Sequence, residues 1–417
     1  MAWRQRGLTL AVASLALGAP AGAAAHDGSA GFAERDVRVL QTWHGQPNGY
    51  FGWAVSELAD IDRDGVTDVI TSEPYANATA GITWVFSGRT GRAIYHFDGA
   101  PGDYQGASLA DAGDTDRDGV HDIISGASGT AGPGRAYLYS GRTGRLLHMW
   151  EGAQPGDTFG SAVASAGDQN HDGFDDVVVG SPGDDSAGEN AGAAYVFSGR
   201  TYLPLRRIDG HPGDGLGAGA DWTPSLDHGR QDDLILGAAT EGGGGGVHVF
   251  SGGDPLFSLA PPAGARFFGT FFVAGVGRVD GDRVPDLYAA DYGAQGGNGW
   301  AGVYSGRDGS LIWGWPGGPG DGRGPGREAG DVDHDGHVDL AVGAYRAGPT
   351  GAGRVDIFSG ATGRILRTFT STTAGEQLGF DALGIGDVNR DGEPDQLLSA
   401  AEGDTVYLVA GRDRRRW

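Results

Sequence analysis

Short runs of alternating apolar and polar residues recur along the chain and are separated by glycine-rich turns. In the first copy these runs are residues 53–58, 69–72, 82–86 and 93–97, which are rich in Val, Ile, Thr and aromatic side chains. Such runs predict β-strands, because β-branched and aromatic side chains suit a half-buried pleated surface. No helical period of useful length follows residue 30. The pattern therefore predicts an all-β fold.

The group of four predicted strands repeats seven times, at an interval of about 54 residues. A turn with the sequence Ser-Gly-Arg-Thr-Gly separates the third and fourth runs at residues 87–91, and it returns at 140–144. Related turns occupy the same place in later copies. Seven such units predict a seven-bladed β-propeller of four-stranded blades, an architecture that protects its sheet edges by radial repetition.

The two ends of the repeat are complementary. The last copy stops after a run at residues 405–409 and lacks a fourth strand. An unassigned run at residues 37–43 precedes the first copy and aligns with the fourth strand of the second copy. We expect residues 37–43 to complete the seventh blade and close the ring. The alternative is an ordered lead-in strand with no such role.

The chain begins with features of an export signal. Arg4 and Arg6 precede an apolar run at residues 8–17, and residues 23–25 offer a small-residue cleavage site. The apolar run is too short to span a bilayer, and we expect no transmembrane segment. The expected organisation is a signal peptide (1–25), a short linker (26–36), the propeller (37–411) and a basic tail (412–417). The protein is expected to be secreted, periplasmic or on the cell surface.

A nine-residue acidic loop follows the first predicted strand in five of the seven copies. Its first, third, fifth and ninth positions carry Asp or Asn, and its sixth position is Gly. Together with the backbone carbonyl of the seventh position, these are the candidate metal ligands: Asp60, Asp62, Asp64, Val66 and Asp68; Asp114, Asp116, Asp118, Val120 and Asp122; Asp168, Asn170, Asp172, Phe174 and Asp176; Asp331, Asp333, Asp335, His337 and Asp339; Asp387, Asn389, Asp391, Glu393 and Asp395.

The composition of these loops favours calcium. Four oxygen-bearing side chains within nine residues repel one another unless a hard cation lies between them, and Ca²⁺ takes six to eight oxygen ligands in flexible geometry. Glycine at the sixth position permits a bend that a side chain would oppose. We therefore predict about five Ca²⁺ sites. The alternatives are solvated acidic turns without an ion, and Mg²⁺, which prefers rigid octahedral sites.

Two copies have lost the pattern. Residues 225–233 contain too few acids, and in 278–286 Arg278 replaces the first Asp while Arg283 replaces the Gly. A guanidinium group there could neutralise the remaining acids of the loop without a metal. We expect both loops to hold no ion, or to bind one very weakly, and to keep only the turn.

The overall charge limits the possible partners. The chain has 417 residues, a net charge of −24 and no cysteine. Such an acidic surface disfavours nucleic acid and anionic membranes, because phosphate binding requires a basic stripe. Without cysteine, disulfides contribute nothing, and metal sites are the plausible means of stabilising the fold.

The repeat resembles the FG-GAP repeat of integrin α-subunit propellers and of related bacterial secreted proteins. The "FG" portion lies at 51–52, 159–160 and 268–269, weakened to Leu-Gly at 216–217 and 378–379, and the "GAP" portion at 126–128, 180–182, 237–239 and 343–345. The resemblance implies a seven-bladed propeller with Ca²⁺ in hairpin loops on one face and partner binding on the opposite face. Integrin α-subunits carry their calcium loops in later blades, whereas here the loops occupy copies 1–3 and 6–7.

These features predict a binding or adhesion module and not an enzyme. The expected partner is an extracellular protein or glycan, and the expected assembly is a monomeric ring. The alternative is a propeller enzyme, resembling a quinone-dependent dehydrogenase or a hydrolase, that uses the central funnel. The nucleophile motif Gly-x-Ser-x-Gly and the zinc motif His-Glu-x-x-His are absent from the sequence.

Two further groups of residues are candidates for smaller roles. Histidines inside the acidic loops are expected to be solvent-facing spacers: His121, His171, His334 and His337. Residues on or beside the connections between second and third strands either form a binding patch or pack between blades: Asn190, Tyr292, Trp300 and Tyr345.

Overall fold

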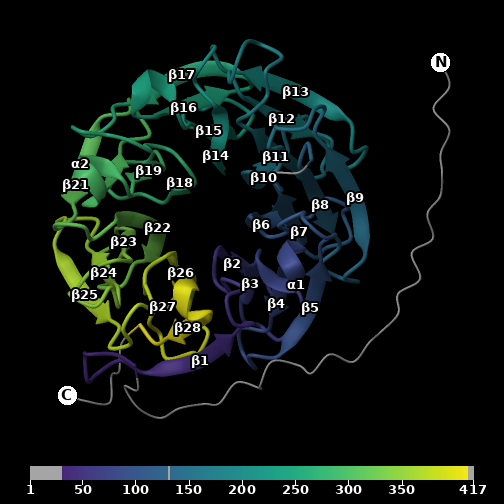
Figure 1. Cartoon of the computed structure of the whole chain (residues 1–417). Helices are drawn as coiled ribbons and strands as arrows, with labels where there is room; N and C mark the ends of the chain where they lie inside the picture. The colour runs from purple at the N-terminus through teal and green to yellow at the C-terminus, as the bar shows by residue number, and fades with distance from the viewer. Residues whose placement is uncertain (1–30, 130–131, 412–417) are drawn as a thin grey trace, which may run out of the picture.

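The computed structural model describes residues 31–129 and 132–411, which form a ring of seven antiparallel sheets (Figure 1). Each sheet has four strands, and the first strand of each blade lies next to the central lumen. The predicted all-β, seven-bladed propeller is confirmed. The predicted signal peptide, residues 26–30 of the predicted linker and the basic tail lie outside the described residues.

The strands follow the same order in blades 1 to 4. Blade 1 contains β2 (Val55–Leu58), β3 (Asp68–Glu73), β4 (Ile82–Phe86) and β5 (Ala93–Asp98). Blade 2 contains β6 (Ser108–Gly113), β7 (Asp122–Ala127), β8 (Arg135–Tyr139) and β9 (Leu146–Glu151). Blade 3 contains β10 (Val163–Gly167), β11 (Asp176–Ser181), β12 (Ala193–Phe197) and β13 (Pro204–Asp209). Blade 4 contains β14 (Leu216–Thr223), β15 (Asp233–Ala238), β16 (Gly246–Ser251) and β17 (Asp254–Leu259).

Blades 5 to 7 repeat this order, except that the last blade takes its outer strand from the start of the chain. Blade 5 contains β18 (Val273–Val276), β19 (Asp286–Asp291), β20 (Trp300–Tyr304) and β21 (Leu311–Pro316). Blade 6 contains β22 (Arg323–Gly330), β23 (Asp339–Ala344), β24 (Arg354–Phe358) and β25 (Ile365–Thr370). Blade 7 contains β26 (Ala382–Gly386), β27 (Asp395–Ala400), β28 (Thr405–Val409) and β1 (Val39–His44).

Short helical turns occur only between second and third strands in the described part of the chain. They are α1 (Ala76–Thr79) in blade 1, η1 (Glu241–Gly243) in blade 4, α2 (Ala294–Gly297) in blade 5 and η2 (Ala401–Gly403) in blade 7. No helix among the described residues has the length and apolar character needed to cross a membrane.

The pairing of β1 with β28 closes the ring, as the sequence predicted. The two strands are antiparallel, and Trp43 lies opposite Val406 (Figure 1). The Trp43 side chain is buried, and its indole N–H donates a hydrogen bond of 2.9 Å to the carbonyl of Gly91 in blade 1. The closing strand therefore joins blade 7 to blade 1 through side-chain contacts as well as through the sheet.

The core consists of apolar layers between adjacent blades. One such layer joins Phe51, Val55 and Phe86 of blade 1 to Leu397 and Leu408 of blade 7. Burying one such side chain contributes about 1.5–3 kcal/mol, so a ring of these layers can stabilise a chain without disulfides.

The FG and GAP segments recur because they meet at close range between neighbouring blades. A Cβ atom on Gly180, in the GAP segment of blade 3, would lie 2.0 Å from the carbonyl oxygen of Gly217, in the FG segment of blade 4. Gly217 also has a φ of 92°, which disfavours other residues. The preceding apolar side chain, Leu216, is buried. The glycines of the two segments thus permit adjacent blades to pack with their backbones in close contact.

Candidate metal centres

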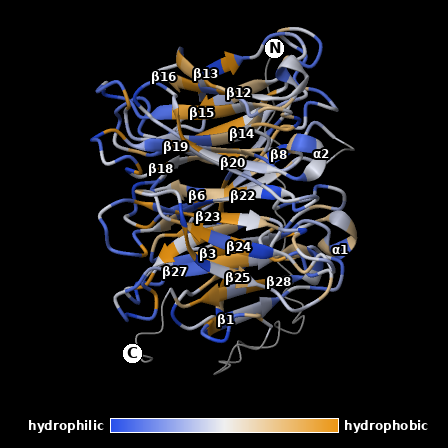
Figure 2. Cartoon of the chain, turned by 90° about the vertical axis from the view of Figure 1, so that its left-hand side faces the viewer, coloured by the Kyte–Doolittle hydropathy of each residue, from blue (hydrophilic) through white to orange (hydrophobic). Residues whose placement is uncertain are grey.

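The acidic loops lie on one face of the ring. Each connects the first and second strands of its blade, whereas α1 and α2 connect second and third strands. Because antiparallel strands alternate in direction, these two kinds of connection lie at opposite ends of the sheets. Figure 2 shows α1 and α2 on one face and a row of hydrophilic loops on the other.

The first-position aspartate folds each of the five loops. In blade 1, Asp60 accepts the backbone N–H of Asp64 through Oδ1 at 2.9 Å and that of Gly65 through Oδ2 at 2.6 Å. The same pair of bonds recurs in the other four loops at 2.7–3.0 Å. This carboxylate therefore shapes the loop whether or not an ion is present.

Two backbone positions of each acidic loop are left-handed. The sixth-position glycines have φ between 82° and 90°, as the sequence predicted. The fourth position is also left-handed, with φ between 59° and 62° in all five loops, although it carries Arg or His. A side chain in this conformation costs about 1–2 kcal/mol, and the hydrogen bonds to the first and third positions offset that cost.

Three loops bring carboxylates together at one point. In these loops, one oxygen from each of the first, third and ninth positions lies within 4.8 Å of the others: Asp60, Asp62 and Asp68; Asp114, Asp116 and Asp122; Asp331, Asp333 and Asp339. The loops of blades 3 and 7 carry Asn at the third position. Asn170 Oδ1 accepts the N–H of Asp172, whereas Asn389 donates Nδ2 to Asp395 at 2.9 and 3.0 Å.

The fifth-position carboxylate contacts an arginine in blades 1 and 2. Asp64 lies 3.5 Å from the guanidinium group of Arg89, and Asp118 lies 2.8 Å from that of Arg142. Both arginines belong to the Ser-Gly-Arg turn between the third and fourth strands. The fifth-position carboxylate and the seventh-position carbonyl stay predictions as calcium ligands.

The ninth-position aspartate is a structural link in every blade. Its side chain is fully buried in all seven blades, and Oδ2 accepts the N–H of the second loop position at 2.7–3.0 Å. In six blades Oδ1 also accepts an N–H from the glycine that follows the third strand, at 2.9–3.2 Å. This role explains why Asp233 and Asp286 persist in the two loops that have lost the acidic pattern.

Burial makes these ninth-position carboxyl groups costly to ionise. Desolvation raises the pKa of Asp68, Asp122, Asp176 and Asp395 to about 7, and that of Asp339 to about 6. A nearby cation favours the ionised form of a carboxyl group. The loops are therefore arranged so that a bound ion would relieve an unfavourable burial.

One acid of the degenerate loop at 278–286 is paired with an arginine from outside the loop. Arg307, in the turn between the third and fourth strands, forms an ion pair of 2.8 Å with Asp282. The sequence analysis had expected Arg278 or Arg283, within the loop itself, to neutralise these acids. The observed guanidinium group instead occupies the same place as Arg89 and Arg142 in their blades.

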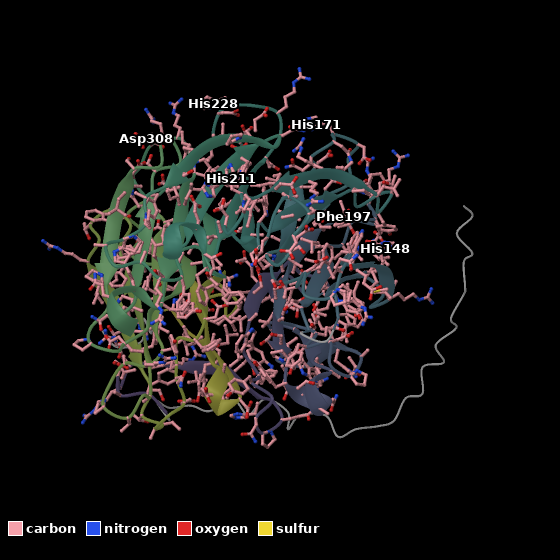
Figure 3. All side chains as sticks on the ribbon, turned by 45° about the horizontal axis from the view of Figure 1, so that its top comes forward. His148, His171, Phe197, His211, His228 and Asp308 are labelled. Atoms are coloured by element: carbon pink, nitrogen blue, oxygen red, sulfur yellow. The ribbon has the colours of Figure 1, made fainter. Side chains whose placement is uncertain are left out.

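Two of the loop histidines contact neighbouring blades: His334, which is exposed as the sequence predicted, and His337, which is only partly exposed and so departs from the expected solvent-facing spacer. His334 Nε2 lies 3.1 Å from Glu393 of blade 7, and His337 Nδ1 lies 2.7 Å from the carbonyl oxygen of Val279 in blade 5. His121 contacts Asp111 of its own blade at 2.9 Å. His171 lies at the edge of the molecule in Figure 3.

The opposite face carries a continuous group of aromatic rings, here called the aromatic rim: Tyr50, Trp53, Tyr75, Tyr345 and Phe380. Ring centroids are 4.9 Å apart for Tyr50 and Tyr75, 5.1 Å for Trp53 and Phe380, and 5.6 Å for Tyr345 and Phe380. All five line one mouth of the central cavity. The sequence singled out only Tyr345. Of its two other aromatic candidates, Tyr292 also lines the central cavity, whereas Trp300 is buried in the core.

Comparison with known proteins supports the repeat assignment. The family model "FG-GAP repeat" matches residues 159–197 and 328–358. The chain is 28% identical over 227 residues to Integrin alpha-5 of Xenopus laevis, covering 49% of this chain and 21% of that protein. It is 30% identical over 195 residues to Integrin alpha-PS5 of Drosophila melanogaster, covering 41% of this chain and 18% of that protein.

A solved structure gives the same fold. The structure of Chaetomium thermophilum Raptor matches 92% of this chain and 29% of its own, with a TM-score of 0.59 and 12% sequence identity. At that identity the match supports the fold alone. The matched region spans about a fifth of the length of the integrin relatives.

Proposed function

We propose that this chain, a seven-bladed propeller with FG-GAP repeats that resembles integrin α chains, is an exported, calcium-stabilised module that binds an extracellular protein or glycan. The proposal depends on one observation above all: three separate three-carboxylate groups, in the loops of blades 1, 2 and 6, lie in connections between first and second strands, at the end of the sheets opposite the aromatic rim. Ions held in this way would stabilise the ring and leave the other face free for a partner.

The donor set fits calcium. Every candidate ligand is a carboxylate, amide or carbonyl oxygen, without nitrogen or sulfur, as a hard cation requires. The three-carboxylate groups of blades 1, 2 and 6 would form the centre of such sites, with Asn170 and Asn389 replacing one charge in blades 3 and 7. Export would place the loops where calcium is abundant enough to fill weak sites.

The separation of the candidate sites favours a binding module over an enzyme. In a propeller enzyme, acids, bases and a metal would converge at one mouth of the lumen. Here the described three-carboxylate groups each belong to a single peripheral loop. This arrangement supports structural roles for the ions and a non-enzymatic role for the protein.

Two matched substitutions separate the metal role from the structural role of the loops. Asp60→Ala should lower the calcium stoichiometry from about five to about four, because Asp60 belongs to a three-carboxylate group. Asp286→Ala should leave the stoichiometry unchanged but lower the free energy of unfolding by about 2–3 kcal/mol, because it leaves buried N–H groups unpaired. Equilibrium dialysis with metal analysis and urea denaturation measure the two quantities. An unchanged stoichiometry in Asp60→Ala would contradict the site in blade 1.

The ligand-binding face can be tested at an exposed aromatic residue. Tyr75 is 40% exposed, and tyrosine combines a large apolar face with a hydroxyl group, a combination common at recognition surfaces. Calcium-loaded protein should bind a subset of an array of glycans and extracellular proteins, and Tyr75→Ala should weaken that binding at least tenfold. Leu203→Ala, exposed near the outer strand of blade 3, serves as the control. Equal binding by both variants would place the ligand elsewhere.

A further inference from the structure

The outer half of blade 4 carries a row of three polar side chains. His248 lies in β16, Ser258 lies opposite it in the neighbouring strand β17, and Glu241 lies in η1. Ser258 Oγ is 2.7 Å from His248 Nδ1, and Glu241 Oε2 is 2.5 Å from His248 Nε2. A hydroxyl group, an imidazole and a carboxylate thus form one hydrogen-bonded row, here called the blade 4 triple.

The carboxylate sets the direction of these hydrogen bonds. A carboxylate only accepts hydrogen bonds, so the imidazole of His248 donates from Nε2 to Glu241. A neutral imidazole then keeps a lone pair on Nδ1, and the Ser258 hydroxyl group donates to it. A base that contacts a hydroxyl group, and is itself oriented by a third group, is the arrangement that activates a serine as a nucleophile.

The other blades show why His248 is held in place. In three of them the third residue of the third strand is aromatic and donates to a carboxylate: Trp84 to Glu73 in blade 1, Tyr195 to Asp184 in blade 3, and Tyr407 to Glu376 in blade 7. His248 occupies the same strand position in blade 4. The bond to the carboxylate is thus part of the repeat, but an imidazole has a second nitrogen that accepts a proton, which indole and phenol rings lack.

A second contact between a hydroxyl group and an imidazole lacks these features. His44 Nδ1 lies 3.0 Å from Thr405 Oγ1. That threonine is buried, and its hydroxyl group donates to the carbonyl oxygen of Gly403 at 2.7 Å, so its proton is not directed at His44. Ser258, by contrast, is exposed, and a reagent can reach its hydroxyl group.

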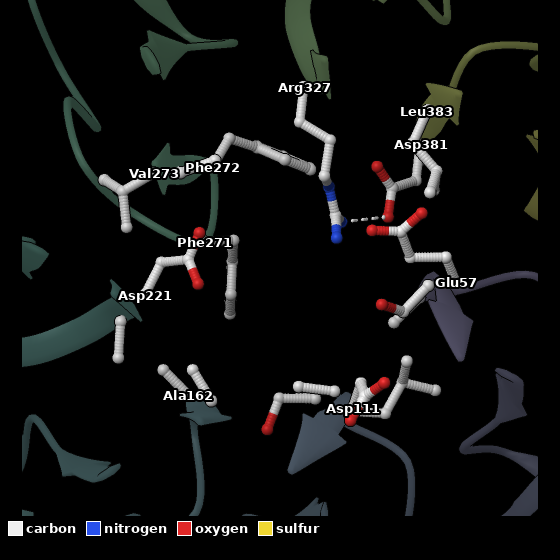
Figure 4. Close-up of a pocket in the computed structure, with 18 of the residues that line it drawn as sticks. Glu57, Asp111, Ala162, Asp221, Phe271, Phe272, Val273, Arg327, Asp381 and Leu383 are labelled. Atoms are coloured by element: carbon white, nitrogen blue, oxygen red, sulfur yellow. Dashed lines mark hydrogen bonds and ion pairs between the residues drawn. The ribbon is translucent and has the colours of Figure 1, made fainter. Parts of the chain in front are cut away.

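The blade 4 triple lines a cavity of its own. The central cavity of the ring has a wall rich in carboxylates, in which Arg327 is paired with Asp381 at 2.9 Å (Figure 4), and the triple does not line it. The triple instead lines a second cavity of 500 Å³, which lies within the size range of small-molecule sites. Leu259 and Ala265 give this cavity an apolar wall, and the five glycines at 242–246 add no side chains that would fill it.

Three N–H groups of the glycine turn are unavailable as an oxyanion hole. The N–H of Gly243 donates to the carbonyl of Thr240, and those of Gly244 and Gly245 both donate to the carbonyl of Glu241. Such donors, when they point at the reacting carbonyl, supply a large share of the rate of a hydrolase. The triple is therefore suited to accepting an acyl group from a reactive donor and not to rapid turnover, which agrees with the non-enzymatic role proposed above.

We propose that Ser258 is an acyl-acceptor site, modified at Oγ by carboxylic esters that have a good leaving group. His248 Nδ1 takes the hydroxyl proton as Oγ bonds to the carbonyl carbon, and Glu241 stabilises the imidazolium ion. The bond from that carbon to the leaving oxygen then breaks, and Nδ1 returns its proton to the departing alcohol or phenol. The products are an ester on Ser258 and the free alcohol or phenol, with no oxidation or reduction.

The composition of the chain makes such a site easy to detect. The sequence contains neither lysine nor cysteine, whose side chains compete for reactive acyl groups. The chain also offers an internal control. Ser310 is an exposed serine between β20 and β21, and its N–H donates to Asp308 at 2.9 Å, so it lies beside a carboxylate but outside the blade 4 triple.

Acetylation by p-nitrophenyl acetate tests the proposal. The full chain, in millimolar calcium, is treated briefly with the ester and mapped by peptide mass spectrometry. Ser258 should gain an acetyl group at least tenfold faster than Ser310, since a positioned base contributes about 10²–10⁴-fold. Equal acetylation of the two serines in the intact protein would overturn the proposal, and this comparison needs no variant.

His248→Tyr separates the chemistry from the structure. Tyrosine holds this strand position in blades 3 and 7 and donates to a carboxylate there, so the variant should melt close to the temperature of the intact protein. Ser258 should nevertheless be acetylated at least tenfold more slowly, while acetylation of Ser310 stays the same. An unchanged rate at Ser258 would show that the imidazole is not the base and would overturn the proposal.

Glu241 acts through the imidazole and is a positioning residue. Glu241→Asp keeps a carboxylate on a shorter side chain, whereas Glu241→Gln keeps the shape without the charge. Acetylation of Ser258 should be at least threefold faster in Glu241→Asp than in Glu241→Gln. The reverse order would mean that Glu241 only fills space, and it would overturn the part of the carboxylate. The calcium proposal stands or fails separately, because the triple lies outside the acidic loops.

Discussion

Removal of calcium with EGTA should lower the melting temperature of this protein by more than about 10 °C. An ion that binds only the folded chain stabilises it by about 2.7 kcal/mol per site at a hundredfold excess over Kd, and about five sites are proposed. Even half of that sum is large, because each kcal/mol shifts the melting temperature of a large domain by about 2–4 °C. Differential scanning calorimetry in millimolar calcium and in EGTA measures the shift.

The controls separate calcium from general ionic effects. Returning calcium should restore the original transition, whereas the same concentration of magnesium should restore little, since Mg²⁺ demands a rigid octahedral site. Identical melting curves with and without EGTA would mean that the acidic loops do not stabilise the ring through ions. The hydrogen bonds of Asp60 and Asp68 would then be their whole contribution.

The fold could be predicted from the sequence because each blade repeats the same local signals. The run at 82–86 is the strand β4, and the run at 37–43 overlaps the closing strand β1. The first run begins later than expected, at Val55, because Gly52 has a φ of 89° and Trp53 donates its N–H to Tyr50 in a turn. The predicted start of this strand was therefore two residues too early, because a turn that belongs to the aromatic rim interrupts the alternating pattern.

The candidate sites were predictable in position but not in detail. Spacing identified the loops, and the three-carboxylate groups of blades 1, 2 and 6 place the first, third and ninth positions together. The ionic partner of the fifth position comes from a turn about 25 residues away, as with Asp118 and Arg142. Likewise, the ninth-position aspartate accepts hydrogen bonds from the loop and from a distant turn. Asp68, for example, accepts the N–H groups of Ile61 in the loop and of Gly88 in the turn after the third strand. Contacts of this kind depend on the assembled blade.

The aromatic rim shows the limit of local reasoning most clearly. Trp53 and Phe380 are far apart in the sequence, yet their ring centroids lie 5.1 Å apart because ring closure brings blade 7 beside blade 1. No pattern within a single copy of the repeat indicates such a contact. The proposed binding face is thus a product of the closed ring, and its integrity depends on the strand that closes it.

Trp43→Ala should be among the most destabilising single substitutions in the chain, lowering the free energy of unfolding by about 3–5 kcal/mol. The indole is buried, donates to Gly91, and lies 5.3 Å from the ring of Phe86, so its loss opens a cavity in the layer between blades 7 and 1. Urea denaturation followed by circular dichroism measures the change.

Comparison with an exposed leucine isolates the effect of closure. Leu203→Ala, 64% exposed, should alter stability by less than about 0.5 kcal/mol. Trp43→Ala should also expose the β28 edge more often, so backbone amides of β28 should exchange hydrogen faster than those of the equivalent β4, which keeps its neighbours on both sides. A small loss of stability, or equal exchange in β28 and β4, would show that the ring holds without its closing strand. The contact between Trp53 and Phe380 in the aromatic rim would then need another source of rigidity.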